Sequence, residues 1–249
     1  MKIVVIGGSG LIGRKLAALL EQGGHSVLAA SPSTGVDAVS GQGLAAALAG
    51  ADAVVDVSNS PSFEEQRVRA FFEASTRNLL AAEAAAGVRH HVALSVVGAE
   101  RLPDSGYMRA KVLQEALIEA ASVPYTIARA TQFFEFLSAI AAASTHDGSV
   151  RAPSATLQPI AAADVAAALV QIATAAPLNG RCELAGPEAV PLDVLLRRRL
   201  QADGDVREVI RDDTASYFGA RIDDRSLVPA GAARLGSTSL QAWLETNAG

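Results

Sequence analysis

Short apolar runs and stretches of helical spacing alternate along this 249-residue chain. The first run, Ile3–Ile6, is unbroken, which is typical of a strand buried on both faces of a parallel sheet. Further strands are expected at Ser26–Ala30, Ala53–Val57, His91–Val97 and Tyr125–Ala130. Helices are expected at Leu11–Leu20, Leu44–Leu48, Phe63–Ala86, Tyr107–Ala121, Gln132–Ala143 and Ala161–Ala173. The alternation predicts an α/β fold with a right-handed, doubly wound parallel sheet.

The alternation of strand and helix patterns is less clear at two places in the chain. Only a few residues separate Ala30 from the helix at Leu44, so Gly35–Val39 is at best the stub of another strand. From Ser144 onward, prolines break the pattern into short pieces. We therefore predict a core over residues 1–143 and a mixed segment, 144–249, that completes the fold and shapes a substrate pocket.

A glycine-rich turn joins the first strand to the first helix. The glycines follow a G-x-x-G-x-x-G spacing, at Gly7, Gly10 and Gly13. In this context the first glycine permits a tight turn, the second lets the backbone approach a pyrophosphate, and the third lets helix and strand pack closely. The alternative is a merely structural turn. The candidate cofactor-binding residues here are Gly7, Ser9, Gly10, Leu11, Ile12, Gly13 and Arg14. We therefore predict that residues 1–143 form a Rossmann-type dinucleotide-binding core.

The end of the second strand bears on which dinucleotide is bound. An Asp or Glu about 20 positions beyond the glycines usually binds the ribose 2′-hydroxyl of NAD. This chain has Ser31–Thr34 there, without an acid. Hydroxyls of Ser31 and Ser33, together with Arg14, suit a 2′-phosphate, so we expect NADP in preference to NAD. The alternative is an ordinary polar turn.

Composition and charge narrow the classes of partner. Charged residues make up 19% of the chain and the net charge is −5, which argues against nucleic acid or an anionic membrane as the main partner. The single cysteine, Cys182, excludes an internal disulfide or a cysteine metal cluster. The N-terminus enters a strand without a signal-like leader, and no apolar run reaches about 18 residues. We expect a cytoplasmic protein that acts on a small molecule.

A second set of candidate residues lies about a hundred positions after the glycines. Tyr107 and Lys111 are four apart, so they project from one face of the predicted helix. A nearby ammonium is expected to lower the pKa of the phenol and make Tyr107 a candidate general acid. Ser95, near the end of the preceding strand, has a hydroxyl suited to holding the same carbonyl oxygen. The alternatives are a surface Tyr–Lys pair and a plain strand-end serine.

Other features favour structural roles. His90 and His91 lie at a helix-to-strand turn without nearby acids, which indicates surface or packing roles and no metal site. The run Arg197–Arg199 is expected to be a solvated helix face. An apolar substrate pocket and core packing are both open for the aromatic residues Phe133, Phe134, Phe136, Tyr217 and Phe218.

Taken together, the glycine turn, the strand-end serine and the Y-x-x-x-K pair resemble the short-chain dehydrogenase/reductase superfamily. The closer similarity is to its atypical, NmrA-like members, which are related to the extended epimerase/dehydratase group. The motifs that carry it are Gly7–Gly13, Gly35–Val55, Thr76–Ser95, Tyr107–Lys111, Pro124–Phe136 and Pro159–Leu169. The resemblance covers about residues 1–186, although the segment between the second strand and Asp37 is shorter than the family usually has.

The resemblance implies roles for particular residues. Ser95, Tyr107 and Lys111 correspond to the catalytic triad, and Lys111 also to the residue that holds the nicotinamide ribose. Asn78 corresponds to a supporting asparagine, and Asp37 to the acid that meets the adenine ring. The implied ribose and nicotinamide contacts are Val57, Ser58, Asn59 and Phe133.

Three functions remain open from the residues. The leading hypothesis is an NAD(P)H-dependent oxidoreductase that transfers hydride to a carbonyl or quinone-like carbon, with Tyr107 as general acid. A second is an NmrA-like regulatory protein that senses NADP(H). A third is a sugar-nucleotide epimerase or dehydratase, which would need Arg151 or Arg197–Arg199 to bind a pyrophosphate.

Overall fold

The structure is a computed structural model that describes residues 1–247. The chain divides into two compact units, each assembled from several segments. The first unit comprises Met1–Ser95, Gly106–Arg129 and Val165–Cys182. The second comprises Val96–Ser105, Ala130–Asp164 and Glu183–Gly249. A division at residue 143 stays a prediction.

The main sheet has seven strands in the order β12-β9-β5-β4-β3-β1-β2. Its strands are β1 (Lys2–Ile6), β2 (Ser26–Ala30), β3 (Ala53–Asp56), β4 (His90–Val96), β5 (Tyr125–Ala130), β9 (Gly180–Ala185) and β12 (Arg234–Leu235). Pairing is parallel from β2 through β1 and β3 to β4, and again between β9 and β12. The order reverses direction at β1, where the chain steps from β2 on one side to β3 on the other. The predicted Rossmann-type, doubly wound sheet is confirmed.

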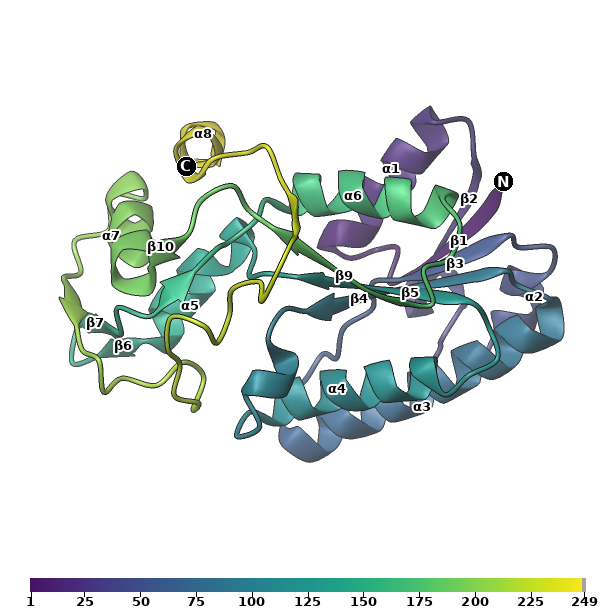
Figure 1. Cartoon of the computed structure of the whole chain (residues 1–249), viewed down its shortest axis with the longest axis horizontal. Coiled ribbons are helices and arrows are strands. Elements are labelled where there is room, and N and C mark those ends of the chain that lie inside the picture. Colours follow the sequence, from purple (N-terminus) through teal and green to yellow (C-terminus); the bar gives the residue numbers. More distant parts are fainter. Residues whose placement is uncertain (248–249) are drawn as a thin grey trace. The chain divides into compact units, whose positions relative to one another are not determined.

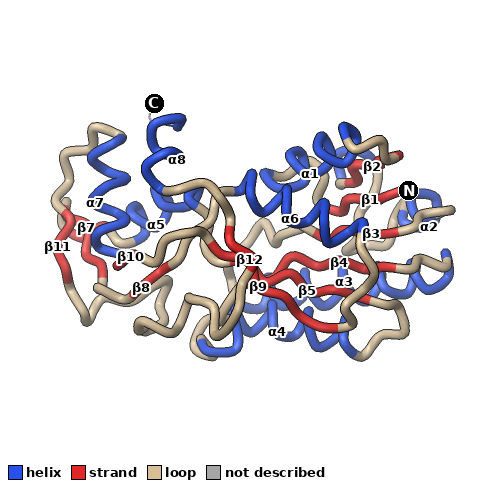
Figure 2. The backbone as a smooth tube through the Cα atoms, turned by 45° about the horizontal axis from the view of Figure 1, so that its top comes forward, coloured by secondary structure: helices blue, strands red, loops and turns tan. Residues whose placement is uncertain are grey.

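Helices cover both faces of the sheet in the first unit. Figures 1 and 2 show α1 and α6 on one face, with α3 and α4 side by side on the other. The helices are α1 (Leu11–Gln22), α2 (Leu44–Leu48), α3 (Glu65–Ala86), α4 (Gly106–Glu119) and α6 (Ala162–Thr174). These positions put the start of α1 directly after the carboxyl end of β1.

The core of the first unit explains why β1 carries no polar side chain between Ile3 and Ile6. Ile3, Val4 and Val5 are all fully buried, because helices pack on both faces of their strand. Leu16 of α1 and Leu79 of α3 are also fully buried. Each such aliphatic side chain stabilises the fold by about 1.5–3 kcal/mol relative to an exposed position.

The stub expected at Gly35–Val39 forms no strand, and β2 is the edge of the sheet. After β2 the chain makes a 3-10 turn, Pro32–Thr34, and then bends through glycines with positive φ at Gly35, Gly41 and Gly43. Too few residues remain before α2 for the chain to extend along β2 and return. The side chains of β2 are therefore partly exposed, including Leu28.

The second unit contains small sheets and short helices. A three-stranded sheet has the order β11-β7-β6, and a two-stranded sheet pairs β10 with β8. Its elements are α5 (Leu137–Ala143), β6 (Thr145–His146), β7 (Ser149–Ala152), β8 (Thr156–Leu157), β10 (Val190–Pro191), α7 (Leu192–Ala202), β11 (Val209–Arg211) and α8 (Leu240–Asn247). Trp243 of α8 packs on the ring of Phe134, with 5.5 Å between ring centroids.

The helix expected at Gln132–Ala143 begins later than predicted. Its first residues form a 3-10 turn, Phe134–Phe136, and α5 starts at Leu137. Gln132 and Phe133 are extended because their backbone bonds to Ile160: the Ile160 N–H donates to the Gln132 carbonyl at 2.8 Å. Within residues 1–247, every helix is too short or too polar to cross a membrane.

Candidate active site

The glycine turn is wedged between the ends of the two strands that flank β1. The N–H groups of Gly7 and Gly8 both donate to the Ala30 carbonyl at the end of β2, at 3.0 Å. Gly7 has a φ of +80°, and a Cβ there would lie 2.8 Å from the backbone of Ser58. Only glycine suits this position, because it combines a left-handed conformation with direct backbone contact.

The turn leaves room for a phosphate at the start of α1. A Cβ on Gly10 would meet only the Gly7 carbonyl, at 3.2 Å, so the outer side of the turn is open. Gly13 differs, because its Cβ would lie 2.2 Å from the Gly7 carbonyl oxygen. No side chain caps the start of α1 among the described residues. The free N–H groups of its first turn therefore suit the pyrophosphate of a dinucleotide.

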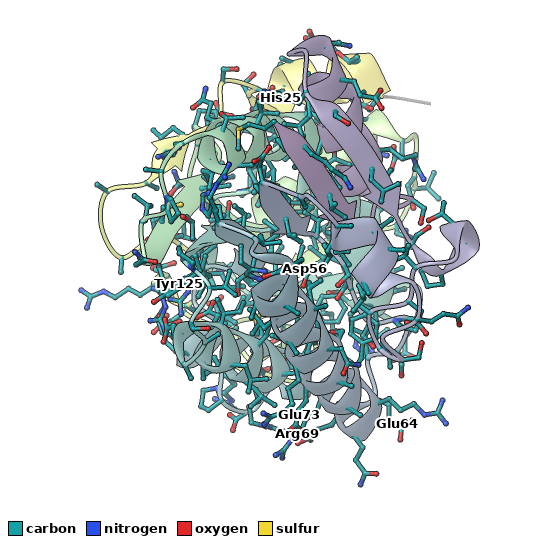
Figure 3. The ribbon with its side chains drawn as sticks, turned by 90° about the vertical axis from the view of Figure 1, so that its right-hand side faces the viewer. His25, Asp56, Glu64, Arg69, Glu73 and Tyr125 are labelled. Carbon is teal, nitrogen blue, oxygen red and sulfur yellow. The ribbon has the colours of Figure 1, made fainter. Side chains whose placement is uncertain are left out.

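The loop after β3 continues the same edge of the sheet. Asp56, the last residue of β3, is buried, and its Oδ1 accepts bonds from the Ser58 N–H at 2.9 Å and the Ser58 hydroxyl at 2.6 Å. Val57 and Ser58 are half-buried, while Asn59 is exposed. Figure 3 shows Asp56 within the ribbon, whereas Glu64, Arg69 and Glu73 of the following helical region lie at its outer margin. This anchored loop carries three of the predicted cofactor contacts.

Tyr107 reaches that loop from the first turn of α4. Its hydroxyl donates to Asn59 Oδ1 at 3.2 Å, and Oδ1 also accepts the Ser60 N–H at 3.0 Å. Burial raises the pKa of the Tyr107 phenol to about 12. The expected lowering of this pKa is therefore wrong. The phenol is a hydrogen-bond donor that holds its proton firmly at neutral pH.

Lys111 explains why the phenol is not acidified. The side chain is only 2% exposed, and its ammonium donates to the Leu94 carbonyl at 2.9 Å and to Gln114 Oε1. It also lies 4.4 Å from the centroid of the Phe72 ring. Burial lowers the pKa of Lys111 to about 8. The ammonium thus points toward β4 and the core, so its position in the structure differs from the ribose-facing one that the resemblance implies.

A second polar cluster occupies the space beneath α4, and Ser95 belongs to it. The Ser95 hydroxyl donates to Glu115 Oε1 at 2.6 Å. Arg129 holds the same carboxylate through two bonds, at 2.9 and 2.5 Å. Arg181 adds a contact at 3.4 Å. Ser95 is 3% exposed, so its hydroxyl is engaged in holding α4 against the sheet, unlike the substrate-facing hydroxyl that we expected.

The Lys111 cluster is joined to the loop after β3 through one glutamine. Gln114 accepts from Lys111 and donates through Nε2 to Asp56 Oδ2 at 3.0 Å. Asp56 in turn holds Ser58. A continuous chain of hydrogen bonds therefore runs from β4 and α4 to Ser58, and it connects the helix that carries Tyr107 to the loop that carries Asn59.

The residues expected to distinguish NADP from NAD lie at the end of β2 and the start of α1. The Ser31 hydroxyl lies 2.8 Å from that of Ser33. The Arg14 guanidinium is exposed and bonds to the Ser9 carbonyl, over the glycine turn. These groups place hydroxyls and one cation next to the glycine turn, and their contact with a 2′-phosphate stays a prediction.

Asp37 and Asn78 organise the loop between β2 and α2. Asp37 accepts from the Val39 N–H at 2.9 Å and from the Ser40 hydroxyl at 2.8 Å, and the Ser40 bond lowers the pKa of Asp37. The Asn78 amide donates to the carbonyls of Ala38 and Val39 at 3.1 and 2.7 Å. Asn78 therefore supports this loop, whereas the resemblance implied a supporting role at the catalytic residues.

Predicted aromatic residues of the second unit fall into separate pairs. Phe133 and Phe136 stack at 5.5 Å, and Tyr217 contacts Phe218 at 4.9 Å. Phe134 is buried and packs on Trp243, so its role is core packing. A cofactor contact by Phe133 stays a prediction.

Two structural expectations are corrected. His90 and His91 lie in β4 and are buried, which agrees with a packing role, but His91 Nδ1 is 2.8 Å from the carboxylate of Glu83, so the expected absence of nearby acids is wrong. Sequence analysis missed Glu83 because it lies on the preceding helix, α3, and only the fold brings its carboxylate next to His91. In the run Arg197–Arg199, Arg197 and Arg198 are exposed as expected, whereas the Arg199 side chain is only 13% exposed, pairs with Asp203 and lies over Trp243.

Comparisons with known proteins identify the family to which the chain belongs. The model of a family described as NAD(P)H-binding matches residues 7–176, which is more than half of the chain. The chain belongs to this NAD(P)H-binding family. The resemblance to atypical, NmrA-like short-chain dehydrogenases/reductases is thereby confirmed. A relative from Streptomyces griseus, named (4-alkanoyl-5-oxo-2,5-dihydrofuran-3-yl)methyl phosphate reductase, is 33% identical over 207 residues, which cover 76% of this chain and 69% of that protein.

Solved structures share the NAD(P)H-binding fold. A short-chain dehydrogenase/reductase superfamily protein from Agrobacterium tumefaciens with bound NAD has a TM-score of 0.75 and 20% identity, covering 100% of this chain and 96% of its own. An NADPH-dependent quinone oxidoreductase from Escherichia coli has a TM-score of 0.71 and 18% identity, covering 98% of both chains. At these identities the structures establish the fold alone.

Several residues that build the NAD(P)H-binding domain and the Tyr107 site were missed from sequence. Asp56, Gln114, Glu115 and Arg129 all support α4 or the loop after β3. The available signal was a carboxylate that ends the apolar run Ala53–Asp56, where an uncompensated charge requires partners. The partners themselves are distant in sequence, so no local pattern marks them.

Replacing Gly10 with alanine tests the phosphate cradle. Gly10 has φ −77° and ψ 179°, which alanine adopts freely, and its Cβ would meet only the Gly7 carbonyl oxygen at 3.2 Å, so the folding stability should fall by less than about 1 kcal/mol. The methyl group enters the space that a pyrophosphate would occupy, and we expect the Kd for NADPH to rise at least about tenfold. Titration by NADPH fluorescence measures it. Gly231→Ala, where a Cβ contacts nothing, is the matched control, and equal binding by both variants would contradict the assignment.

Proposed function

We propose that the protein is an NADPH-dependent reductase of a carbonyl or quinone-like substrate, with Tyr107 as general acid. One observation carries the proposal: the Tyr107 hydroxyl bonds to Asn59, one residue from Ser58, whose backbone abuts Gly7 of the glycine turn. A proton donor and a phosphate cradle therefore share one edge of the sheet, within one compact unit. The reductase name of the Streptomyces griseus relative supports the same reaction class.

Individual residues of the chain have separate roles in the proposed reaction. When bound, NADPH supplies the hydride. Tyr107 protonates the carbonyl oxygen as negative charge develops on it, because the growing oxyanion is a stronger acceptor than the Asn59 amide. The raised pKa of Tyr107 keeps this proton in place until the charge appears. Asn59 orients the phenol, while Lys111 and Ser95 hold α4 in position through β4 and Glu115.

The preference for NADPH is proposed to come from Arg14, Ser31 and Ser33. Arg14→Ala should raise the Kd for NADPH about tenfold and leave that for NADH nearly unchanged, because only NADPH carries a 2′-phosphate. Fluorescence titrations with the two cofactors measure the ratio. A similar loss for both would mean that Arg14 acts on the shared pyrophosphate or on the turn itself.

The reductase proposal is tested by following NADPH fluorescence with a panel of quinones and aldehydes. Oxidation of NADPH by the native protein, absent with Tyr107→Phe, is the expected result. Tight NADPH binding without turnover of any acceptor would favour the NADP(H)-sensing protein instead.

The sugar-nucleotide hypothesis gains no support from the second unit. It needed free cations for a nucleotide pyrophosphate, but Arg197 is paired with Asp193, and Arg199 with Asp203. Arg151 lies 3.5 Å from Asp212. Binding a ligand through Arg151, Arg197 or Arg199 would require breaking these ion pairs, which leaves the exposed Arg198 as the available cation of the set, so we propose the reductase.

A further inference from the structure

Phe63 is the most exposed aromatic side chain next to the Tyr107 site. It lies in the segment between β3 and α3 and is 75% exposed. Its ring centroid is 5.8 Å from that of Tyr107, with the two planes tilted by 48°. Exposure of a single aromatic side chain is common on protein surfaces, so the informative observation is that this ring lies against Tyr107 with most of its area free.

A second aromatic residue, Phe72, contacts Tyr107 from the core side. The ring of Phe72 contacts it edge-on at 6.1 Å and is completely buried. Phe72 therefore stabilises the fold, whereas Phe63 leaves most of its ring available. The Tyr107 ring thus has one aromatic neighbour in the core, Phe72, and one that faces solvent, Phe63. Its hydroxyl bonds to Asn59.

The segment that carries Phe63 is held by its own side chains. Ser60 is buried, and its hydroxyl accepts the Ser62 N–H at 3.2 Å. The Ser62 hydroxyl accepts the Glu64 N–H at 3.1 Å. These bonds on either side of Phe63 restrain its backbone, so the ring is presented to solvent from an ordered turn.

We propose that Phe63 determines substrate specificity by offering its ring to a planar aromatic or extended apolar group attached to the carbonyl that Tyr107 protonates. The inference rests on the proposed reductase function and names the class of substrate. Aromatic contacts of this kind favour offset or edge-on packing, which the tilted and largely free ring permits. Small polar carbonyl compounds have no ring or extended apolar group to offer for this contact.

Two diketones with the same reacting group test the inference. 9,10-Phenanthrenequinone has a planar aromatic body, and 2,3-butanedione has only methyl groups. With Phe63→Ala we expect KM for the quinone to rise about threefold to tenfold, with kcat little changed and with both constants for butanedione unaltered. Phe63→Leu, which keeps apolar area without a ring, should give a smaller rise.

Leu178→Ala is the matched control. Leu178 is 52% exposed in the same unit, and its N–H bonds to Thr126 near the amino end of β5, at the opposite edge of the sheet from Asn59. Neither diketone should be affected. Equal changes for both diketones with Phe63→Ala, or no change for either, would overturn the inference while leaving the reductase function intact.

A binding measurement separates failure of the inference from failure of the function. Phenanthrenequinone is titrated into NADPH-loaded Tyr107→Phe protein, with quenching of NADPH fluorescence as the readout. Adding Phe63→Ala should raise the Kd about threefold to tenfold even where no diketone is turned over. An unchanged Kd for phenanthrenequinone would contradict the proposed role of Phe63, whether or not the native protein is a reductase.

Discussion

Tyr107→Phe is expected to lower kcat for carbonyl reduction by about 10²- to 10⁴-fold, the usual contribution of a positioned general acid. Phenylalanine keeps the ring contacts with Phe63 and Phe72 and removes only the hydroxyl. The Kd for NADPH should therefore stay within about twofold, since a bond to Asn59 and not to the cradle is lost. Steady-state rates and NADPH fluorescence titration measure the two quantities.

The pH profile gives an independent check on Tyr107. Because burial raises its pKa to about 12, the phenol keeps its proton throughout the neutral and mildly alkaline range. The rate should not fall between about pH 7 and pH 10 through ionisation of this group. A Tyr107-dependent alkaline limb with an apparent pKa near about 9 would show that the phenol is acidified in the working enzyme.

Arg129→Met is expected to destabilise the protein by about 3–5 kcal/mol, measured as the free energy of unfolding in urea. Glu115 is 1% exposed, and among the described residues its remaining partners would be the Ser95 hydroxyl, the longer contact to Arg181 and the charge of Lys111 once the bidentate partner is lost. A buried carboxylate that loses its main counter-charge is costly. Since Glu115 anchors α4, which carries Tyr107, kcat should also fall.

An exposed ion pair provides the control. Arg77 pairs with Glu73 on α3 at 3.2 Å, with 60% of the arginine side chain exposed. Arg77→Met removes the same kind of interaction and should cost less than about 1 kcal/mol. Similar losses for the two variants would mean that the Arg129–Glu115 pair gives no more stability than a surface pair.

Local signals in the sequence were sufficient for the order of elements in the first part of the chain and for the glycine turn between β1 and α1. The apolar run Ile3–Ile6, the glycines at Gly7 and Gly13 and the helical spacing after Leu11 each act over a few residues, and the structure has them where expected. The same holds for β2, α2 and β5, whose bounds agree with the prediction.

Local sequence signals did not reveal which residues Tyr107, Lys111 and Ser95 contact. The four-residue spacing placed Tyr107 and Lys111 on one helix, but it did not show that the ammonium turns toward Leu94. Nor did it show that Ser95 bonds to Glu115.

By itself, then, the sequence determined the strand, turn and first helix, because backbone conformation there depends on neighbouring residues. The tertiary structure alone decided which groups meet: Tyr107 with Asn59, 48 positions apart, and Gln114 with Asp56, 58 apart. The physical reason is that buried polar side chains must find partners wherever packing brings them, and packing is a property of the whole chain.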